Sequence, residues 1–205
     1  MDLGKFKEFG KRYNKIIETV YENYYSSIVK RSNAILTYNK LGEEYFANSH
    51  LIHKNKIQIL NNTIDEDAIF NATQYHNYAQ EADKMFPRLT AKIKNFRNIV
   101  LYVGTINYDK NLQILPLIHE KLGESYFFII VGDGIYKPLL EKQMNSANTF
   151  FAGEVVDIMT LCFFYKKSNV FLLPGLGGLA INQSLALVVP VICSEADGSE
   201  QEGCA

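Results

Sequence analysis

The sequence has few cysteines, almost no net charge and no long apolar run. Its three cysteines, Cys162, Cys193 and Cys204, lack metal-type spacing, and two lie inside apolar runs, so a disulfide framework is not expected. A formal charge of −1 gives no field that would attract nucleic acid. No window approaches the roughly 18 apolar residues of a membrane-spanning helix, and the start is polar. We therefore expect a cytoplasmic protein without a nucleic-acid partner.

Metal-ligand sets and nucleophile motifs are also missing. His50 and His53 are three residues apart without an acidic or cysteine partner, and His76 and His119 stand alone, so we expect no bound metal. The sequence contains no nucleophile elbow and no Ser, His, Asp arrangement. The usual signatures of a metalloenzyme and of a serine hydrolase are absent.

The first part of the chain has the pattern of an incomplete α/β unit. Apolar residues recur at steps of three and four from Lys5 to Arg31, which predicts an amphipathic helix. We expect this helix to pack on a neighbouring sheet rather than on a membrane, because its polar face mixes both charges. A strand over 34–38, a helix over 41–49 and a strand over 56–60 follow, which are βαβ pieces without a complete sheet. Residues 66–96 are polar and include Pro87, and they predict a linker with one or two weak helices.

From residue 97 onward, apolar runs alternate with helix-length segments. The runs are 99–103, 126–131, 149–151, 170–173 and 189–193, and the segments are 110–122, 136–144, 157–167 and 179–187. Continuous apolar strands between amphipathic helices predict a doubly wound α/β domain with a parallel sheet covered on both faces. Ligands of such sheets bind at the carboxyl ends of the strands.

Two of these strand ends carry glycines or a lysine. After the first run, Gly104 permits a close turn, and Lys110 is expected to begin the helix that follows. A lysine there either binds a phosphate or is an ordinary solvated residue. Gly132 and Gly134 follow the second run, but Lys137 stands where a dinucleotide fingerprint requires a third glycine. They serve either a ligand or a tight turn.

The fourth run ends in a glycine-rich turn that leads into a helix. Gly175, Gly177 and Gly178 let the main chain approach a ligand, and free N–H groups there favour anionic or hydroxyl-rich groups. On the helix, Gln183 beside Asn182 can bond sugar or ribose hydroxyls, or form an ordinary polar face.

The order of these motifs resembles a known family. The blocks NIVLYVGTINYDKNL, FFIIVGDGIYKPLLEKQ, TFFAGEV, DIMTLCFFYKKSNVFLLPG and GLAINQSLALVVPVICSEADGSEQE, over 98–205, are similar to the C-terminal half of retaining GT-B glycosyltransferases, family 4 or group 1. SNAILTYNK and KIQILNNTID look like the end of the family's N-terminal domain. The resemblance implies an acceptor-side remnant over 1–65, a linker over 66–96, and a nucleotide-sugar-binding Rossmann-like domain over 97–205, truncated at its C-terminus, in a gene fragment.

The resemblance also implies partners and site residues. The donor is a nucleotide-diphosphate sugar, the acceptor is a glycan or a lipid-linked sugar, no metal or other cofactor takes part, and peripheral membrane association is compatible with it. Lys110 would bind the diphosphate, the segment from Gly153 to Val155 the nucleobase, and Gln183 the ribose. The implied donor-binding residues are Gly104, Thr105, Lys110, Gly132, Gly134, Gly153, Glu154, Val155, Gly175, Gly177, Gly178, Leu179 and Gln183.

Three positions depart from the family pattern. Thr105 stands in place of an arginine, which removes a charge-assisted contact to the diphosphate. Gly175 and Gln183 stand in place of the family's paired glutamates, so both carboxylates are missing. We therefore expect hexosyl transfer as the family activity and no activity from this polypeptide alone. The alternatives are a non-catalytic nucleotide- or sugar-binding α/β module and, less favoured because the fingerprint is absent, a fold that binds NAD or FMN.

Overall fold

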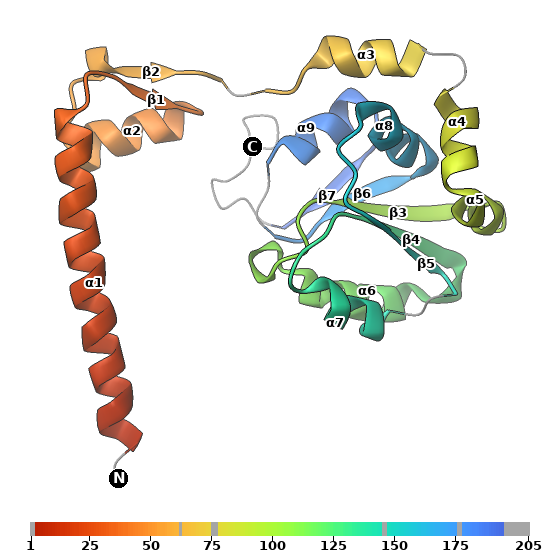
Figure 1. The fold of residues 1–205 in the computed structure, drawn as a ribbon, viewed down its shortest axis with the longest axis horizontal. Helices are drawn as coiled ribbons and strands as arrows, with labels where there is room; N and C mark the ends of the chain where they lie inside the picture. Colours follow the sequence, from red (N-terminus) through yellow and green to blue (C-terminus); the bar gives the residue numbers. More distant parts are fainter. Residues whose placement is uncertain (1–2, 62, 75–77, 145–146, 176–177, 195–205) are drawn as a thin grey trace. The chain divides into compact units, whose positions relative to one another are not determined.

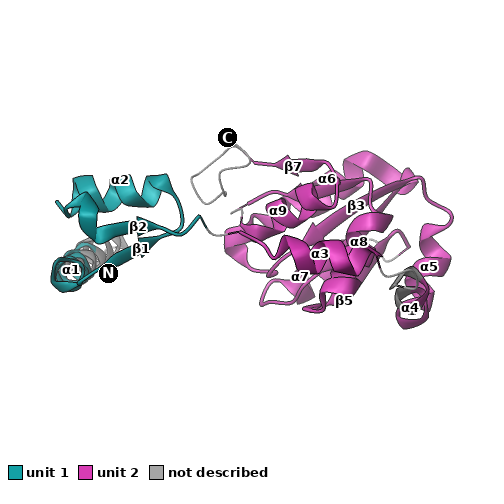
Figure 2. Ribbon diagram, turned by 90° about the horizontal axis from the view of Figure 1, so that it is seen from above, with its two compact units in different colours: residues 1–62 teal, residues 63–205 magenta. Residues whose placement is uncertain are grey.

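The chain folds into two compact units. The computed structural model describes residues 3–61, 63–74, 78–144, 147–175 and 178–194. Unit 1 comprises Met1–Asn62 and unit 2 comprises Thr63–Ala205 (Figure 2). The boundary between the units lies just before the segment 66–96 that the sequence suggested as a linker.

Unit 1 consists of a long helix followed by a small βαβ arrangement (Figure 1). Its elements are α1 (Leu3–Arg31), β1 (Ile35–Thr37), α2 (Lys40–Ser49), the 3-10 turn η1 (Lys54–Lys56) and β2 (Ile57–Ile59). The two strands pair in parallel, with Ile35 opposite Ile57. Asn39 caps α2, because its side-chain oxygen accepts a hydrogen bond of 3.0 Å from the amide of Gly42. The elements expected for this part of the chain are confirmed.

Several apolar residues in the described part of α1 are exposed, contrary to the expectation that the helix packs on a sheet. The exposed fractions lie between 49% and 68% for Ile17, Val20, Tyr21, Tyr24 and Ile28. Near the end of the helix, Val29 is buried and the Tyr25 ring packs on the His50 ring with centroids 5.6 Å apart. Apolar periodicity identifies which face of a helix is apolar, but it does not identify what covers that face.

Unit 2 contains a five-stranded parallel sheet in the order β5-β4-β3-β6-β7. The strands are β3 (Asn98–Val103), β4 (Tyr126–Val131), β5 (Thr149–Gly153), β6 (Val170–Leu173) and β7 (Val191–Cys193), and each coincides with a predicted apolar run. In β4, residues 127–131 are at most 1% exposed. Such continuous burial is typical of a parallel strand covered on both faces. The doubly wound α/β fold is confirmed.

Helices cover both faces of this sheet (Figure 1). α6 (Leu115–Leu122) and α7 (Lys137–Gln143) lie on one face, and α8 (Ile158–Lys167) and α9 (Leu179–Ala186) lie on the other. The segment 66–96 forms α3 (Glu66–Gln74), α4 (Tyr78–Met85) and α5 (Pro87–Ile93), of which α3 and α4 pack against α8. Ile69 and Ala72 of α3 and Leu89 of α5 belong to the core. This segment therefore contributes a helical layer to unit 2.

One predicted helix is broken. Over 110–122 the α-helix begins only at Leu115, after the 3-10 turns η2 (Tyr108–Lys110) and η3 (Leu112–Ile114). Asn111 between the turns has φ 51° and ψ 32°, a left-handed conformation that is incompatible with a right-handed helix. Pro116 then lies in the first turn of α6, where a missing amide hydrogen is tolerated. The prediction that Lys110 opens a helix is therefore wrong.

Candidate functional site

The strand order of unit 2 contains a topological switch point between β3 and β6. The chain proceeds from β3 outward to β5 and then crosses back to β6, on the other side of β3. The connections after β3 and β6 leave in opposite directions, and ligands of doubly wound sheets bind at this switch point. The described site residues lie at or shortly after the carboxyl ends of β3, β4, β5 and β6, which meet at one edge of a parallel sheet.

Glycines join the ends of β3, β4 and β5 through main-chain contacts. The amide of Gly104 donates a hydrogen bond of 3.0 Å to the carbonyl of Val131, and the amide of Gly132 donates one of 2.7 Å to the carbonyl of Gly153. A Cβ atom at Gly132 would overlap the carbonyl oxygen of Gly104, and its φ of 139° is one that L side chains rarely adopt. Glycine at position 132 is therefore required by both space and backbone conformation.

The turn after β4 packs against the loop after β3. The amide of Ile106 donates to the carbonyl of Asp133 at 2.8 Å, and the amide of Tyr136 donates to the carbonyl of Ile106 at 2.9 Å. A Cβ atom at Gly134 would lie 2.6 Å from Oδ1 of Asn107. Gly134 thus permits the close approach of these two loops.

Asp133 and Lys137 form an ion pair in this turn. The Asp133 carboxylate accepts hydrogen bonds of 2.9 Å from Lys137 Nζ and 2.7 Å from the amide of Gly134. These bonds hold the pKa of Asp133 below its usual value. The ammonium group of Lys137, at the position of the missing third glycine, is therefore engaged within the turn.

Tyr102 fixes the main chain at Thr105. Its phenol, 1% exposed as a residue, donates a hydrogen bond of 2.7 Å to the carbonyl oxygen of Thr105. Burial, with a smaller contribution from the charge of Asp109, raises the pKa of Tyr102 above its usual value, so the phenol keeps its proton at neutral pH. The Thr105 residue itself is exposed. The position where the resemblance implies an arginine is therefore open to solvent.

The loops after β3 and β6 meet at the switch point. Nδ2 of Asn111 donates a hydrogen bond of 3.0 Å to the carbonyl oxygen of Pro174. A Cβ atom at Gly175 would lie 2.5 Å from the carbonyl oxygen of Lys110 and 2.7 Å from its Cα. The main chain of Lys110 is thus packed directly on Gly175.

The glycine-rich turn leads into α9. Gly178 precedes the helix with φ 144°, and no atom lies within 4 Å of the position that its Cβ would take. Leu179 begins the helix and is exposed, and Gln183 is half-buried one turn later. Gly177 lies outside the described residues.

The last residue of β5 is an open glycine, and the segment that follows it contains a helix cap. Gly153 has φ 77° and an unoccupied Cβ position, Glu154 is exposed, and Val155 packs partly against the core. Asp157 caps α8 by accepting hydrogen bonds from the Thr160 hydroxyl at 2.7 Å and the Thr160 amide at 2.8 Å. These bonds lower the pKa of Asp157.

Sequence reasoning missed Asn111 and Tyr102. A signal existed for Asn111, because asparagine tolerates the left-handed conformation better than most residues and directly follows the singled-out lysine. The hydrogen bond from Asn111 to Pro174 joins segments that are far apart in the chain, so no local sequence pattern predicts it. The same is true of the packing of Gly175 on Lys110.

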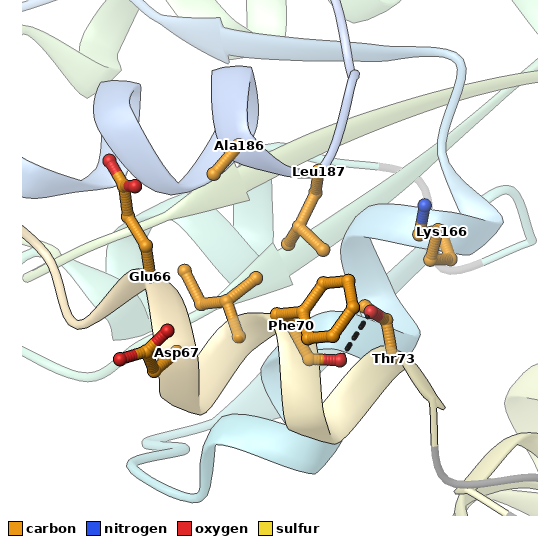
Figure 3. A pocket seen from close by; sticks show the side chains of 8 residues that line it. Glu66, Asp67, Phe70, Thr73, Lys166, Ala186 and Leu187 are labelled. Carbon is orange, nitrogen blue, oxygen red and sulfur yellow. Dashed lines mark hydrogen bonds between the residues drawn. The ribbon is translucent and has the colours of Figure 1, made fainter.

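A cavity of about 460 Å³ lies elsewhere in unit 2, between α3, α8 and α9 (Figure 3). Lys166 belongs to the last turn of α8, and Leu187 follows α9, so both precede the strands β6 and β7. The cavity is therefore at the amino ends of the strands. The glycine-lined edge, formed by Gly104, Gly132, Gly153 and Gly175, is at their carboxyl ends. Its lining residues are Glu66, Asp67, Ile69, Phe70, Thr73, Lys166, Ala186 and Leu187.

The described residues offer neither a cluster of metal ligands nor a helix suited to span a membrane. Within the described ranges, no three or more His, Cys, Asp and Glu side chains gather in a group that could hold a metal ion. Among the helices that the structure describes, none has the length and apolar character needed to cross a membrane.

Several solved structures share this fold. A glycosyltransferase from Rickettsia africae superposes with a TM-score of 0.66 at 15% identity, over 87% of this chain and 48% of that chain. The Anabaena protein HepE, solved in complex with UDP, superposes with a TM-score of 0.60 at 16% identity, over 82% of this chain and 46% of that chain. These similarities define the fold class, a GT-B glycosyltransferase fold.

Sequence similarity then defines the family. The model of the family described as glycosyl transferases group 1 matches residues 97–204, more than half of the chain. The chain therefore belongs to the group 1 glycosyltransferases. Sulfoquinovosyl transferase SQD2 of Arabidopsis thaliana is 31% identical over 114 residues, which are 51% of this chain and 22% of that protein. The chain thus spans about half of the solved neighbours and a smaller share of this curated relative.

Proposed function

We propose that unit 2 binds the nucleotide-diphosphate sugar of a retaining hexosyl transfer, and that the acceptor is a glycan or a lipid-linked sugar. Where the acceptor is lipid-linked, we propose peripheral association with the membrane that presents it. The observation that carries the proposal is the glycine-lined edge at the switch point, where four strand ends converge. Main-chain groups that approach a ligand closely suit phosphate and sugar hydroxyls. Membership of the family and the UDP complex of HepE support a nucleoside diphosphate as the ligand.

Thermal melting with nucleotides tests donor binding. The purified chain is melted with UDP, GDP, ADP, NAD or FMN at millimolar concentration. A ligand at about a hundred times its Kd stabilises the folded state by roughly 2.7 kcal/mol, which is visible as a rise in Tm. We expect a rise with UDP or GDP. A rise only with NAD or FMN, or none from a chain that melts cooperatively, would contradict the proposal.

A matched pair of lysine variants locates the binding site. Lys110→Met removes the ammonium group from the switch-point edge, and we expect it to abolish most of the Tm rise with UDP. Lys121→Met is the control, because Lys121 is an exposed residue in the last turn of α6, near the amino end of β4. Equal loss of the Tm rise in both variants would show that the effect is not specific to the site.

We also propose that this chain alone does not transfer sugar. Neither Gly175 nor Gln183 has a carboxylate, and positioning of donor and acceptor supplies much of the rate in such reactions. The test incubates the chain with radiolabelled UDP-hexoses and a panel of oligosaccharide and lipid-linked acceptors. Labelled product above the level of a heat-denatured control would overturn this part of the proposal while leaving donor binding in place.

A further inference from the structure

The loop after β3 and the loop after β6 contact each other at the switch point. The β3 loop contributes Lys110 and Asn111, and the β6 loop contributes Pro174 and Gly175. Nδ2 of Asn111 donates a hydrogen bond of 3.0 Å to the carbonyl of Pro174, and Gly175 packs against the main chain of Lys110. The two loops are therefore in direct contact with each other.

The conformation of Asn111 explains why this residue can form the bridge. At φ 51° and ψ 32° it turns the chain between η2 and η3, so that its side chain meets the β6 loop instead of continuing a helix. Its Oδ1 accepts a hydrogen bond of 2.6 Å from Nε2 of Gln113, which leaves the amide nitrogen as the donor to Pro174. Both ends of the amide group are thus used.

Gly175 is needed for space rather than for an unusual φ. Its φ lies outside the range that L side chains avoid, yet a Cβ atom there would lie 2.5 Å from the carbonyl oxygen of Lys110. The atom in the way is main chain, which cannot rotate aside as a flexible side chain can. Any side chain at position 175 must therefore push the β3 loop away.

We propose that Asn111 and Gly175 are positioning residues that couple the two loops, and that this coupling holds the main chain around Lys110 where the phosphate groups of a nucleotide are bound. The phosphate part of this inference rests on the proposed function. The coupling itself rests on the geometry of the two loops. The proposal assigns a role to two residues that carry no charge and do not need to touch the sugar.

Amide hydrogen exchange tests the coupling without any ligand. The amides of Lys110 and Asn111 donate to the carbonyls of Asn107 and Tyr108, both at 3.3 Å, so their exchange reports on the integrity of the β3 loop. We expect Gly175→Ala, a change in the β6 loop, to accelerate their exchange about tenfold or more, measured by NMR. Unchanged exchange at both amides in a folded Gly175→Ala variant would overturn the coupling.

Affinities for UDP and uridine test the positioning role. Asn111→Gly permits the left-handed conformation and removes the whole side chain, including the amide group that donates to Pro174 and accepts from Gln113. Loss of the hydrogen bond that positions the loop should weaken the binding of UDP about fivefold or more. The affinity for uridine, which has no phosphate, should be unchanged. Calorimetry measures both affinities. A merely structural role would weaken both ligands equally, and that result would overturn the assignment.

A control variant separates these effects from general destabilisation. Gly123→Ala introduces strain at φ 69°, with no atom within 4 Å of the new Cβ, in the segment that leads into β4. It should lower Tm without changing either the exchange of Lys110 or the ratio of UDP to uridine affinity. If the wild-type chain binds no UDP, the proposed function and the phosphate part of this proposal both fail, whereas the exchange measurement still decides the coupling. If Gly175→Ala does not fold, Asn111→Gly adds no atoms and carries the test.

Discussion

The carbonyl oxygen of Gly104 occupies the space that a side chain of Gly132 would take. This contact lies between two adjacent strands, β3 and β4, at the edge where the candidate site is located. The neighbouring hydrogen bond from the amide of Gly132 to the carbonyl of Gly153 extends the contact to β5. The ends of three strands are therefore held together by main-chain groups, and glycine is what permits this spacing.

Alanine substitutions at two of these glycines should differ in cost. Gly153→Ala places a side chain on a residue with a positive φ but creates no clash, so we expect a loss of about 1 to 2 kcal/mol in the free energy of unfolding. Gly132→Ala adds an overlap with main chain, and we expect a loss of about 3 kcal/mol or more. Urea denaturation measures both. Equal losses would mean that backbone conformation alone sets the requirement for glycine.

The cap of α8 should make part of the stability depend on pH. Asp157→Ala removes the acceptor for Thr160 and should cost about 1 kcal/mol at pH 7. Because the pKa of Asp157 is lower in the folded chain than in the unfolded chain, its ionic contribution is complete above the unfolded pKa, about 3.9. That contribution is lost as the pH falls through the lower, folded pKa. Denaturation of wild type and Asp157→Ala from pH 7 to pH 2 measures this loss.

A conservative variant isolates the ionisation of Asp157. Asp157→Asn keeps a capping oxygen that does not titrate. The difference in unfolding free energy between wild type and this variant should change only at acid pH, with wild type losing stability relative to asparagine. A constant difference across the range would show that the carboxylate charge does not contribute.

The strands of unit 2 could be predicted because burial on both faces leaves a direct trace in the sequence. Residues 127–131 are apolar without interruption, and the structure buries all of them. The edge at which the site lies could also be predicted, since the carboxyl ends of parallel strands must meet. The glycines after β3, β4 and β6 could therefore be predicted from the order of the strands, whereas Gly153 was implied only by the family resemblance.

Other features depended on contacts that the sequence does not encode locally. Asn111 interrupts an apolar periodicity that otherwise continues from 110 to 122, and the left-handed turn is stabilised by a bond to Pro174. The stripe of α1 predicted a packed helix, yet Tyr24 is 68% exposed. Residues 66–96 are too polar to predict a layer of the fold, although Ile69 and Ala72 suffice to pack α3 on the core.

Replacing Thr105 with arginine should strengthen phosphate binding. Thr105 is exposed, and its carbonyl is held by Tyr102, so a longer side chain can be accommodated without moving the loop. Charge-assisted hydrogen bonds from a guanidinium to a diphosphate should raise the affinity for UDP about tenfold and leave the affinity for uridine unchanged. Calorimetry measures both, and Thr105→Gln serves as the uncharged control. Equal affinities of the arginine and glutamine variants for UDP would contradict the placement of the phosphates beside Thr105.

Gly175 and Gln183, where the family resemblance implies glutamates, should respond differently when a carboxylate is added. Gln183→Glu changes one atom on a half-buried helix residue, so stability should be nearly unchanged. A carboxylate accepts stronger hydrogen bonds from ribose hydroxyls than an amide does, so uridine should bind about fivefold more tightly. Asn182→Asp adds the same charge one residue earlier and should not reproduce this gain.

At Gly175 the same addition should fail, because the main chain of Lys110 fills the space beside it. We expect Gly175→Glu to lower the free energy of unfolding by about 3 kcal/mol and to weaken UDP binding, since the loop that carries Lys110 must move. Urea denaturation and calorimetry measure the two effects in the same preparation. A Gly175→Glu variant that keeps wild-type stability and binds UDP more tightly would show that the two loops can separate without cost. The double variant Gly175→Glu with Gln183→Glu should have the same stability and the same affinity for UDP as Gly175→Glu alone. Displacement of the loop that carries Lys110 weakens donor binding whether or not position 183 has a carboxylate.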